Sequence, residues 1–322
     1  MDSSDNGSGQ PIVVITGASR GIGAATARLF LDCGWTTIVT ARSREALRPL
    51  IEAGAHPVTL DLGDSEGIIA TAEQILRIGT PDVLVNNAGC GLPGPLEEID
   101  DAAARHQLQT NVIGPLTLTR ALVPAMRGRG GSGGCQRGCR ETGRLRTGSA
   151  VAGPSEPRVV MVTSVLSSLH QPMSGWYCAS KAALSSLTDT LRLELRGTGQ
   201  VLNAGQGDGA GAGGGAGRVR VIEIQPGPVH TGWQAREATQ LREVTAGGAY
   251  QRWAEAIARR TEARGPKGAA PEEVARAILL AASARHPRSR YVVGPGVRAA
   301  RVVGALMPPR VLDAVLGAYF RP

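Results

Sequence analysis

The sequence of 322 residues is poor in aromatic side chains and contains no long apolar run. Trp, Tyr and Phe make up 3% of the residues within a hydrophobic content of 42%, so a core must consist mainly of Val, Ile, Leu and Ala. No stretch approaches the roughly 18 consecutive apolar residues of a membrane-spanning helix. The first ten residues, MDSSDNGSGQ, are polar and acidic and match neither a signal peptide nor a transit peptide. The sequence therefore predicts a cytoplasmic protein whose residues 1–10 are disordered.

Cysteine is also scarce, and the basic charge is unevenly spread. The five Cys residues are odd in number and irregularly spaced, which argues against a disulfide framework and suits a reducing compartment. Cys135 and Cys139 have no His nearby, so we expect no metal site. Seven Arg against two Glu between Arg127 and Arg158 place +5 of the net charge of +8 in one Gly-rich stretch. A nucleic-acid footprint would instead be a basic face with stacking aromatics on a folded element, so we expect no nucleic-acid partner.

Short apolar runs alternate with helix-length segments along most of the chain. The predicted strands are residues 12–15, 36–40, 57–60, 83–85, 159–162, 219–224 and 291–293. The predicted helices are residues 22–33, 43–53, 65–77, 99–126, 177–196 and 271–283. Strands made of unbroken β-branched runs, alternating with helices, indicate a parallel sheet covered on both faces. The expected fold class is α/β, a Rossmann-type doubly wound parallel sheet of about seven strands, in a single domain over residues 11–296.

Two Gly-rich segments, residues 128–157 and 197–217, interrupt this alternation. Within the second, GQGDGAGAGGGAG contains eight Gly among thirteen residues. Neither segment can bury enough apolar surface to offset its ordering entropy, so both are interpreted as flexible insertions. Each follows a helix and precedes a strand, which places it at the sheet edge opposite to the ligand-binding edge. An inert insertion and a regulatory or partner-binding segment are both consistent with this placement.

A glycine-rich loop, TGASRGIG at residues 16–23, follows the first strand and opens the first long helix. Gly17, Gly21 and Gly23 allow a tight turn and the close approach of a pyrophosphate. The helix N-terminus offers unpaired N–H groups and the positive end of a dipole. Strand, loop and helix in this order predict a dinucleotide-binding site.

The end of the second predicted strand indicates which dinucleotide binds. An acidic residue there would bind the ribose 2′-hydroxyl of NAD(H), but the sequence contains Arg42 followed by Arg44. Arg42, joined by Arg20 from the glycine loop, can pair with a 2′-phosphate. NADP(H) is therefore favoured over NAD(H), with solvated arginines as the alternative interpretation. Asp61, after the third strand, is expected either to accept a hydrogen bond from the adenine amino group or to cap a helix.

Tyr177 and Lys181 stand four residues apart in the sequence YCASK, so they share one face of a predicted helix. A phenol is a poor acid–base group at neutral pH, and a neighbouring cation lowers its pKa. The pair alone is weak evidence, because the spacing occurs by chance in many helices. Its value depends on the motifs around it.

Taken with these motifs, the chain resembles the short-chain dehydrogenase/reductase family. The matching stretches are TGASRGIG, NNAG at residues 86–89, Asn111, Ser164, YCASK and PGPVHT at residues 226–231. They occur in the family's order and span nearly the whole chain. The Gly-rich insertions depart from the family pattern, and Ser167 stands where many members carry Gly.

The resemblance implies a role for each matching residue. Tyr177 would be the general acid in carbonyl reduction or the base in alcohol oxidation. Lys181 would lower the pKa of Tyr177 and hold the nicotinamide ribose, and Ser164 would hydrogen-bond the substrate oxygen. Asn111 would support a water in a proton relay to Lys181. The cofactor channel would comprise Gly17, Ser19, Arg20, Gly21, Ile22, Gly23, Arg42, Asp61, Leu62, Asn87, Ala88, Gly89, Tyr177, Lys181, Pro226, Gly227, Val229 and Thr231.

Two further segments bear on the substrate and partners. Residues 232–268 carry Trp233, Tyr250 and Trp253 above the expected site, which predicts an aromatic lid over an apolar substrate or a lid packed on its own body. Residues 297–322 form an amphipathic tail with basic flanks, which suits either a membrane surface or docking onto the domain or a partner subunit. The tail is loosely similar to that of family members acting on steroids, retinoids or acylated glycerone phosphates.

The leading functional hypothesis is an NADP(H)-dependent oxidoreductase that interconverts a carbonyl and a primary or secondary alcohol on a small lipophilic substrate. The nicotinamide would supply the hydride, and Tyr177 would supply the proton. A non-catalytic dinucleotide-sensing scaffold and an isomerase or dehydratase on the same fold are the alternatives. The resemblance also implies a homodimer or homotetramer through the helices that carry Asn111 and Tyr177.

Overall fold

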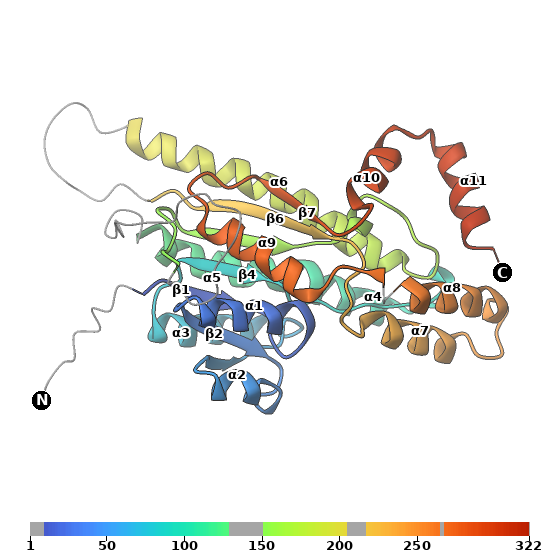
Figure 1. Ribbon diagram of the computed structural model, residues 1–322, viewed down its shortest axis with the longest axis horizontal. Coiled ribbons are helices and arrows are strands. Elements are labelled where there is room, and N and C mark those ends of the chain that lie inside the picture. The colour runs from blue at the N-terminus through green and yellow to red at the C-terminus, as the bar shows by residue number, and fades with distance from the viewer. Residues whose placement is uncertain (1–9, 129–150, 205–216, 265–266, 322) are drawn as a thin grey trace, which may run out of the picture.

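The computed structural model describes residues 10–128, 151–204, 217–264 and 267–321. A seven-stranded sheet with the order β3-β2-β1-β4-β5-β6-β7 forms the centre of the molecule, and every strand pair is parallel (Figure 1). The strands are β1 (Ile12–Ile15), β2 (Thr36–Ala41), β3 (His56–Thr59), β4 (Val83–Asn86), β5 (Arg158–Val162), β6 (Arg220–Pro226) and β7 (Arg290–Val293). The predicted fold class is confirmed, because all seven predicted strands are present in one doubly wound sheet.

Helices cover both faces of this sheet, as Figure 1 shows. On one face α1, α2 and α9 pack against Val13 and Ile15, and on the other α3, α5 and α6 pack against Val14. Neighbouring residues of a strand point to opposite faces, which explains why β1 is apolar at every position. The main covering helices are α1 (Gly21–Asp32), α2 (Arg48–Glu52), α3 (Ser65–Ile78), α4 (Asp101–Leu108), α5 (Gly114–Gly128), α6 (Gly175–Ala204) and α9 (Pro271–Ser283).

The strand order reverses next to β1. The chain leaves β1 toward β2 and β3 on one side and returns to β4 on the other side. The loops that follow β1 and β4 therefore diverge at the carboxyl ends of these strands and leave a crevice between them, where ligands bind in open parallel sheets.

The helix predicted over residues 99–126 is divided in the structure. It consists of α4, a π-helical turn at Gln109–Ile113 and α5. A π-helical turn inserts one residue into the helical repeat and frequently lies at a functional site. Here it contains Asn111, whose side chain hydrogen-bonds to Cys90 in the loop after β4.

The second Gly-rich segment begins later than predicted, because α6 continues to Ala204. The backbone of residues 197–204, assigned from sequence to a flexible insertion, is helical. Extending an existing helix adds one hydrogen bond for each residue fixed, which is less costly than starting a new helix. This sustains the helix through the Val201-Leu202-Asn203-Ala204 run before the glycines dominate.

The first Gly-rich segment also ends earlier than predicted. Val151, assigned to the insertion, is buried, and its N–H donates to the carbonyl of Cys33 at 3.2 Å. Residues 151–157 thus lie on the domain, because an apolar Val can join the core beside α1. Gly217, at the end of the second segment, donates its N–H to the carbonyl of Arg127 at 2.9 Å. The remainder of both segments lies outside the described residues.

Four of the helices that follow β6 form two pairs, α7 with α8 and α10 with α11, at one end of the molecule (Figure 1). Residues 232–268 contain α7 (Trp233–Val244) and α8 (Gln251–Arg264), and the tail contains α10 (Val297–Leu306) and α11 (Pro309–Tyr319). Phe320 and Leu316 of the tail pack into a small core with Trp253 of α8. The indole N–H of Trp253 donates to the carbonyl of Phe320 at 2.6 Å, which fixes the tail to the domain. None of the helices in the described ranges is long and apolar enough to cross a membrane.

Candidate active site

A cavity of about 770 Å³ opens at the carboxyl ends of the strands, above the crevice between β1 and β4. Its walls are the glycine loop, the loops after β2 to β6 and the first turns of α6, α7 and α10. Every predicted catalytic or cofactor-binding residue lines it except Gly23 and Asn111. These two lie directly behind the wall and support it.

The glycine loop packs too closely for side chains. Gly17 has φ +67°, and a Cβ there would lie 2.8 Å from the Cα of Ala88. A Cβ at Gly23 would lie 2.3 Å from the carbonyl oxygen of Gly17. Arg20 begins α1 without a side-chain cap, and the first turn contains no acidic residue. The N–H groups of this turn are therefore open to the cavity, which fits a phosphate group of a dinucleotide.

Asn87 and Thr16 tie this loop to the end of β4. The Asn87 amide Nδ2 donates to the carbonyl of Thr16 at 2.9 Å, and the hydroxyl of Thr16 accepts the backbone N–H groups of Asn87 and Ala88, both at 3.0 Å. These hydrogen bonds join the ends of β1 and β4, the two strands that flank the crevice. Asn87 thus fixes the loop as well as lining the cavity.

The residues predicted to select the dinucleotide stand on one side of the cavity. Arg20 and Arg42 are exposed and line the cavity, and the buried Leu62 lines it as well. Asp61 accepts the backbone N–H of Gly63 at 2.8 Å and stays exposed. Its alternative role as a helix cap is excluded, because Asp64 is the residue that caps α3.

The loop after β6 closes the opposite side. Gly227 donates its N–H to the carbonyl of Val293 at 2.9 Å, and a Cβ on Gly227 would lie 2.4 Å from Val297 of α10. Thr231 lies over the glycine loop, where a Cβ on Gly21 would come within 3.1 Å of it. The loop is thus confined between α10 and the N-terminus of α1, and the tail supplies a wall of the cavity.

Tyr177 and Ser164 face each other across the cavity floor. Tyr177 lies in the first turn of α6, and Ser164 lies two residues after the end of β5, close enough for its hydroxyl to lower the pKa of the phenol. Lys181, one turn after Tyr177, places its Nζ 5.9 Å from the centre of the phenol ring and donates to the carbonyl of Val162 at 3.2 Å. Two hydroxyl groups and one ammonium therefore converge on one region of the cavity.

The electrostatics of this group differ from the sequence-based expectation. Burial raises the pKa of Tyr177, and the hydrogen bond from Ser164 opposes this only in part. Burial also lowers the pKa of Lys181 to about 8. The predicted lowering of the Tyr177 pKa by Lys181 is wrong for this structure, because the ammonium is directed to the Val162 carbonyl and desolvation dominates. Tyr177 is accordingly a protonated phenol, a hydrogen-bond and proton donor.

Asn111 reaches the site from the π-helical turn. Its Oδ1 accepts the N–H of Cys90 at 2.8 Å, and its Nδ2 donates to the carbonyl of Cys90 at 2.9 Å and to the hydroxyl of Ser180 at 3.0 Å. The side chain thus joins the loop after β4 to the helix that carries Tyr177 and Lys181. Its support of a water in a proton relay stays a prediction.

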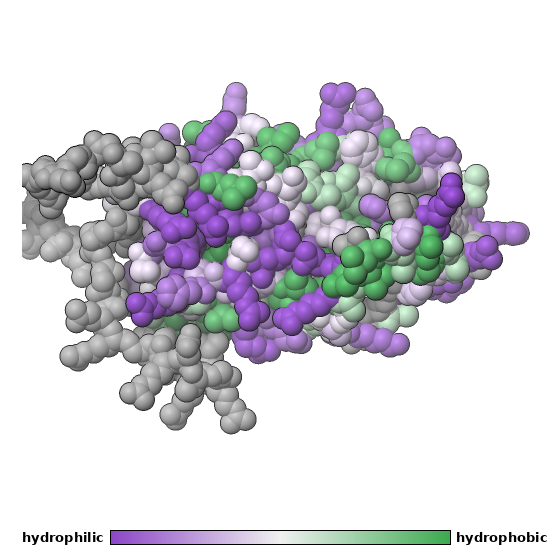
Figure 2. All heavy atoms as spheres, turned by 90° about the horizontal axis from the view of Figure 1, so that it is seen from above, coloured by the Kyte–Doolittle hydropathy of each residue, from purple (hydrophilic) through white to green (hydrophobic). Residues whose placement is uncertain are grey.

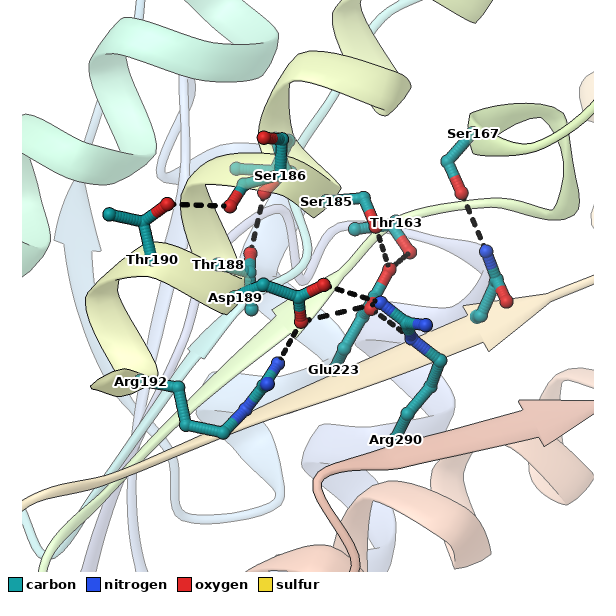
Figure 3. A network of polar contacts seen from close by, with 12 residues as sticks. Thr163, Ser167, Ser185, Ser186, Thr188, Asp189, Thr190, Arg192, Glu223 and Arg290 are labelled. Atoms are coloured by element: carbon teal, nitrogen blue, oxygen red, sulfur yellow. Dashed lines mark hydrogen bonds and ion pairs between the residues drawn. The ribbon is translucent and has the colours of Figure 1, made fainter. Parts of the chain in front are cut away.

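A polar network is centred on the buried side chain of Glu223 (Figure 3). Glu223 of β6 is fully buried and accepts from the hydroxyls of Thr163 at 2.6 Å and Ser185 at 2.8 Å. Arg290 of β7 forms an ion pair with Glu223 and another, at 3.0 Å, with Asp189 of α6. Thr163, the residue before Ser164, and Ser185, one helical turn after Lys181, are thus both held to Glu223 of β6.

Ser167, where many family members carry Gly, also has a structural role. Its hydroxyl donates to the carbonyl of Ser164 at 2.7 Å and accepts from the amide of Gln225 at 2.5 Å, a contact drawn in Figure 3. The turn that presents the Ser164 hydroxyl is thereby anchored to β6.

Several cavity residues were not predicted individually as site residues. Among the aromatic residues of the lid segment, Trp233 lines the cavity, with its ring centre 5.8 Å from that of Tyr177. Tyr250 and Trp253 instead pack in the small core with the tail, so these two follow the alternative of a lid packed on its own body, and an apolar substrate beneath Trp233 stays a prediction. Glu237, one helical turn after Trp233, and Ala300 of the tail also line the cavity. The i, i+4 spacing of Trp233 and Glu237 was the available signal for a shared face.

The fold and the cavity define a doubly wound α/β protein with a site suited to a dinucleotide, and comparisons with known proteins specify its family. A model of the short chain dehydrogenases matches residues 11–134 and 150–206. The uncharacterized oxidoreductase YbbO of Escherichia coli (strain K12) is 28% identical over 312 residues, covering 95% of this chain and 94% of that protein. Human 17-beta-hydroxysteroid dehydrogenase type 1 is 30% identical over 295 residues, covering 87% of this chain and 76% of that protein.

Solved structures show the same relationship. A short-chain dehydrogenase from Streptomyces avermitilis has a TM-score of 0.68 and 28% identity, covering 99% of this chain and 98% of that one. A short-chain dehydrogenase/reductase from Burkholderia phymatum, solved in complex with NAD, has a TM-score of 0.68 and 25% identity, covering 95% of each chain. The chain belongs to the short-chain dehydrogenase/reductase family. It is an oxidoreductase that acts on CH–OH groups.

Proposed function

We propose that the protein is an NADP(H)-dependent enzyme that interconverts a carbonyl and an alcohol on a lipophilic substrate. One observation carries the proposal: the neighbouring Tyr177 and Ser164 line the same cavity as the open N-terminus of α1. A proton donor and an anion site within one cavity of about 770 Å³ suit a substrate held beside a dinucleotide.

The residues present fit a nicotinamide dinucleotide. The glycine loop and the first turn of α1 would hold the pyrophosphate, and Thr231 with Val229 would meet the nicotinamide end. When bound, this cofactor supplies or accepts a hydride. The choice of NADP(H) rests on Arg42 and Arg20, which line the cavity where an acid would otherwise bind the ribose.

The side chains suit proton transfer to a substrate oxygen. Carbonyl reduction builds negative charge on that oxygen, and two donors, the Ser164 hydroxyl and the Tyr177 phenol, would stabilise the charge where it develops. Because burial keeps Tyr177 protonated, the phenol is ready to donate its proton in the reductive direction. Lys181, whose Nζ lies 5.9 Å from the centre of the phenol ring on the same cavity wall, would hold the nicotinamide ribose beside the phenol.

Apolar side chains form much of the substrate half of the cavity. Leu166 and Leu169 come from the loop after β5, Trp233 from α7 and Val297 from α10. These surfaces favour an apolar body on the substrate, because covering them removes apolar area from water.

Turnover of a panel of aliphatic, steroid and retinoid ketones and aldehydes, followed by NADPH absorbance, tests the proposal. We expect Tyr177→Phe to lose roughly 100-fold or more in kcat while still binding NADPH. Tyr250→Phe is the matched control, because Tyr250 is outside the cavity and its hydroxyl contacts Glu97 at 2.7 Å. Full turnover by Tyr177→Phe, or product formation without stoichiometric NADPH consumption, would refute the reaction.

Cofactor choice has its own test. Arg42→Asp should lower the NADPH to NADH ratio of kcat/KM by roughly 10-fold or more, because each 1.4 kcal/mol of lost pairing is a factor of ten. Arg44→Asp makes the same charge change at an exposed residue that does not line the cavity. Equal effects of the two substitutions would contradict the assignment of Arg42.

We also propose self-association through the helices around the site. Ile113 of the π-helical turn is 49% exposed, and Leu187 and Leu193 of α6 are 39% and 65% exposed. Apolar side chains on neighbouring helices are a surface that a second copy of the chain would cover. Light scattering should give a dimer or tetramer mass, and Leu193→Asp should lower that mass; a monomer in the unmodified protein would contradict it.

The tail offers a second outward apolar surface. On α10 Val302 is 56% and Leu306 78% exposed, with Val311 and Val315 exposed on α11. Figure 2 shows apolar side chains gathered over these helices beside hydrophilic ones. Four Arg and one Asp in residues 297–322 make the tail basic, so we propose contact with an anionic lipid surface.

Vesicle sedimentation tests the lipid contact. The protein should bind vesicles of phosphatidylcholine with phosphatidylserine more than vesicles of phosphatidylcholine alone. Leu306→Asp should abolish the difference, whereas Leu280→Asp, at a residue 50% exposed on α9, should not. Equal partition into both vesicle types would overturn the proposal.

A further inference from the structure

The substrate half of the cavity contains a carboxyl group that the proposed chemistry does not use. Glu237 lies on α7 and lines the cavity together with Trp233, one turn before it. The hydroxyl of Ser174 donates to its Oε1 at 3.2 Å, and the Trp233 side chain lies close enough to oppose the rise in the pKa of the carboxyl group. Ser174 in turn accepts from the amide of Gln171 at 3.1 Å. This chain of donors fixes the carboxyl group against the cavity wall.

The carboxyl group retains unused hydrogen-bonding capacity. An ionised carboxylate has about four acceptor positions, and the Ser174 hydroxyl occupies only one of them. No ion pair joins Glu237 to a cation among the described residues. Burial raises its pKa, and its charge acts on Tyr177 across the cavity. A partly desolvated acceptor without a cation is costly unless another donor reaches it.

From this geometry we infer that Glu237 binds a hydrogen-bond donor, a hydroxyl or an ammonium group, at the end of the substrate opposite to the reacting carbonyl. The inference rests on the proposed carbonyl reduction and narrows its substrate class to amphipathic molecules. The apolar body would lie along Trp233, whose ring packs on Tyr177 and whose side chain also neighbours Glu237, one helical turn further on. The indole thus spans from the reacting group to the donor subsite.

This arrangement also bears on the reaction. Negative charge that develops on the substrate oxygen near Tyr177 would be opposed by an uncompensated carboxylate in the same cavity. A donor from the substrate, above all a cationic one, would offset that repulsion. Substrates that carry the donor should therefore gain in kcat/KM, and those that lack it leave a buried acceptor unpaired.

A matched set of aryl ketones tests the inference, with the group at the far end of the ring system being hydrogen, methoxy, hydroxyl or aminomethyl. Methoxy only accepts hydrogen bonds and controls for size. We expect kcat/KM with NADPH to be roughly 10-fold or more higher for hydroxyl or aminomethyl than for methoxy, as hydrogen bonds to charged groups allow. The two donor arms distinguish a hydroxyl from an ammonium ligand.

Substitutions assign the preference to this residue. Glu237→Leu should reduce the donor-to-methoxy ratio of kcat/KM to about one, and Glu237→Gln should reduce it most for aminomethyl, because the amide carries no charge. Glu243→Gln, the same change at an exposed position of α7, should leave the ratio intact. The ratio within each variant cancels any general loss of activity. A preference that is absent in the unmodified protein, or that persists in Glu237→Leu, overturns the inference. A protein that reduces none of the ketones instead refutes the proposed function.

Discussion

Replacing Lys181 by Met is expected to make the protein more stable and inactive. Lys181 is 4% exposed, and burial lowers its pKa from an ordinary value of 10.5 to about 8. That difference lowers the free energy of unfolding by about 3 kcal/mol at pH 7, because the ammonium stays charged in a desolvated position of the folded protein. Met has a similar length and no charge, so it removes this cost. It also removes the hydrogen bond to the Val162 carbonyl, a loss of about 1–2 kcal/mol.

The net expectation is therefore a gain of about 1–2 kcal/mol in the free energy of unfolding at pH 7. The sign also depends on pH. Between about 8 and 10.5 the unfolded chain binds more protons at Lys181 than the folded protein, so stability of the unmodified protein rises with pH across this range. The Met variant lacks this rise, and the two stability curves should converge as pH increases.

Urea unfolding without cofactor, followed by Trp fluorescence between pH 7 and 9.5, measures both effects. Lys267→Met, at an exposed residue, controls for the loss of a charge in general. NADPH consumption with a reducible ketone should be abolished in Lys181→Met only. A Lys181→Met variant that is less stable at pH 7, or that keeps the slope of the unmodified protein, would refute the reasoning.

Three further substitutions should have measurable effects. Gly23→Ala should raise the Kd for NADPH roughly 10-fold or more in a fluorescence titration, because its Cβ would lie 2.3 Å from a carbonyl oxygen of the glycine loop; unchanged affinity would contradict the tight packing. Arg290→Met should cost about 3 kcal/mol in denaturant unfolding by leaving Glu223 buried without its cation, and adding Glu223→Gln should recover most of it. Equal stability of single and double variants would argue against the pair. Trp253→Phe should cost about 1 kcal/mol and speed proteolysis of the tail, because the bond to the Phe320 carbonyl at 2.6 Å is lost; an unchanged cleavage rate would count against tail docking.

Local sequence was sufficient for the sheet and the glycine loop. The β-branched runs and the TGASRGIG loop determine structure within a few residues, so the strands and the close packing at Gly17 and Gly23 could be predicted. Contacts between distant segments were not accessible in this way. Val297 becomes a cavity wall only because the tail folds back onto Gly227, and no periodicity in the tail indicates this partner.

The pKa of Tyr177 shows a second limit. Spacing placed Lys181 on the same helix face and correctly brought the ammonium near the phenol ring. Spacing could not show that the ammonium is directed to the Val162 carbonyl, nor how strongly the cavity desolvates the phenol. Electrostatic shifts depend on burial, and burial depends on every element around the site.

The hydrogen bond from Gly217 to the Arg127 carbonyl has a consequence for engineering. It brings together the end of α5 and the start of β6, so the first Gly-rich segment starts beside the point where the second one ends, on the side remote from the cavity. A reporter domain with neighbouring termini could be inserted at either place, where its own folding would not need the catalytic loops to move. The edge of the sheet that carries the Gly-rich segments and the edge that carries the cavity could then be engineered independently.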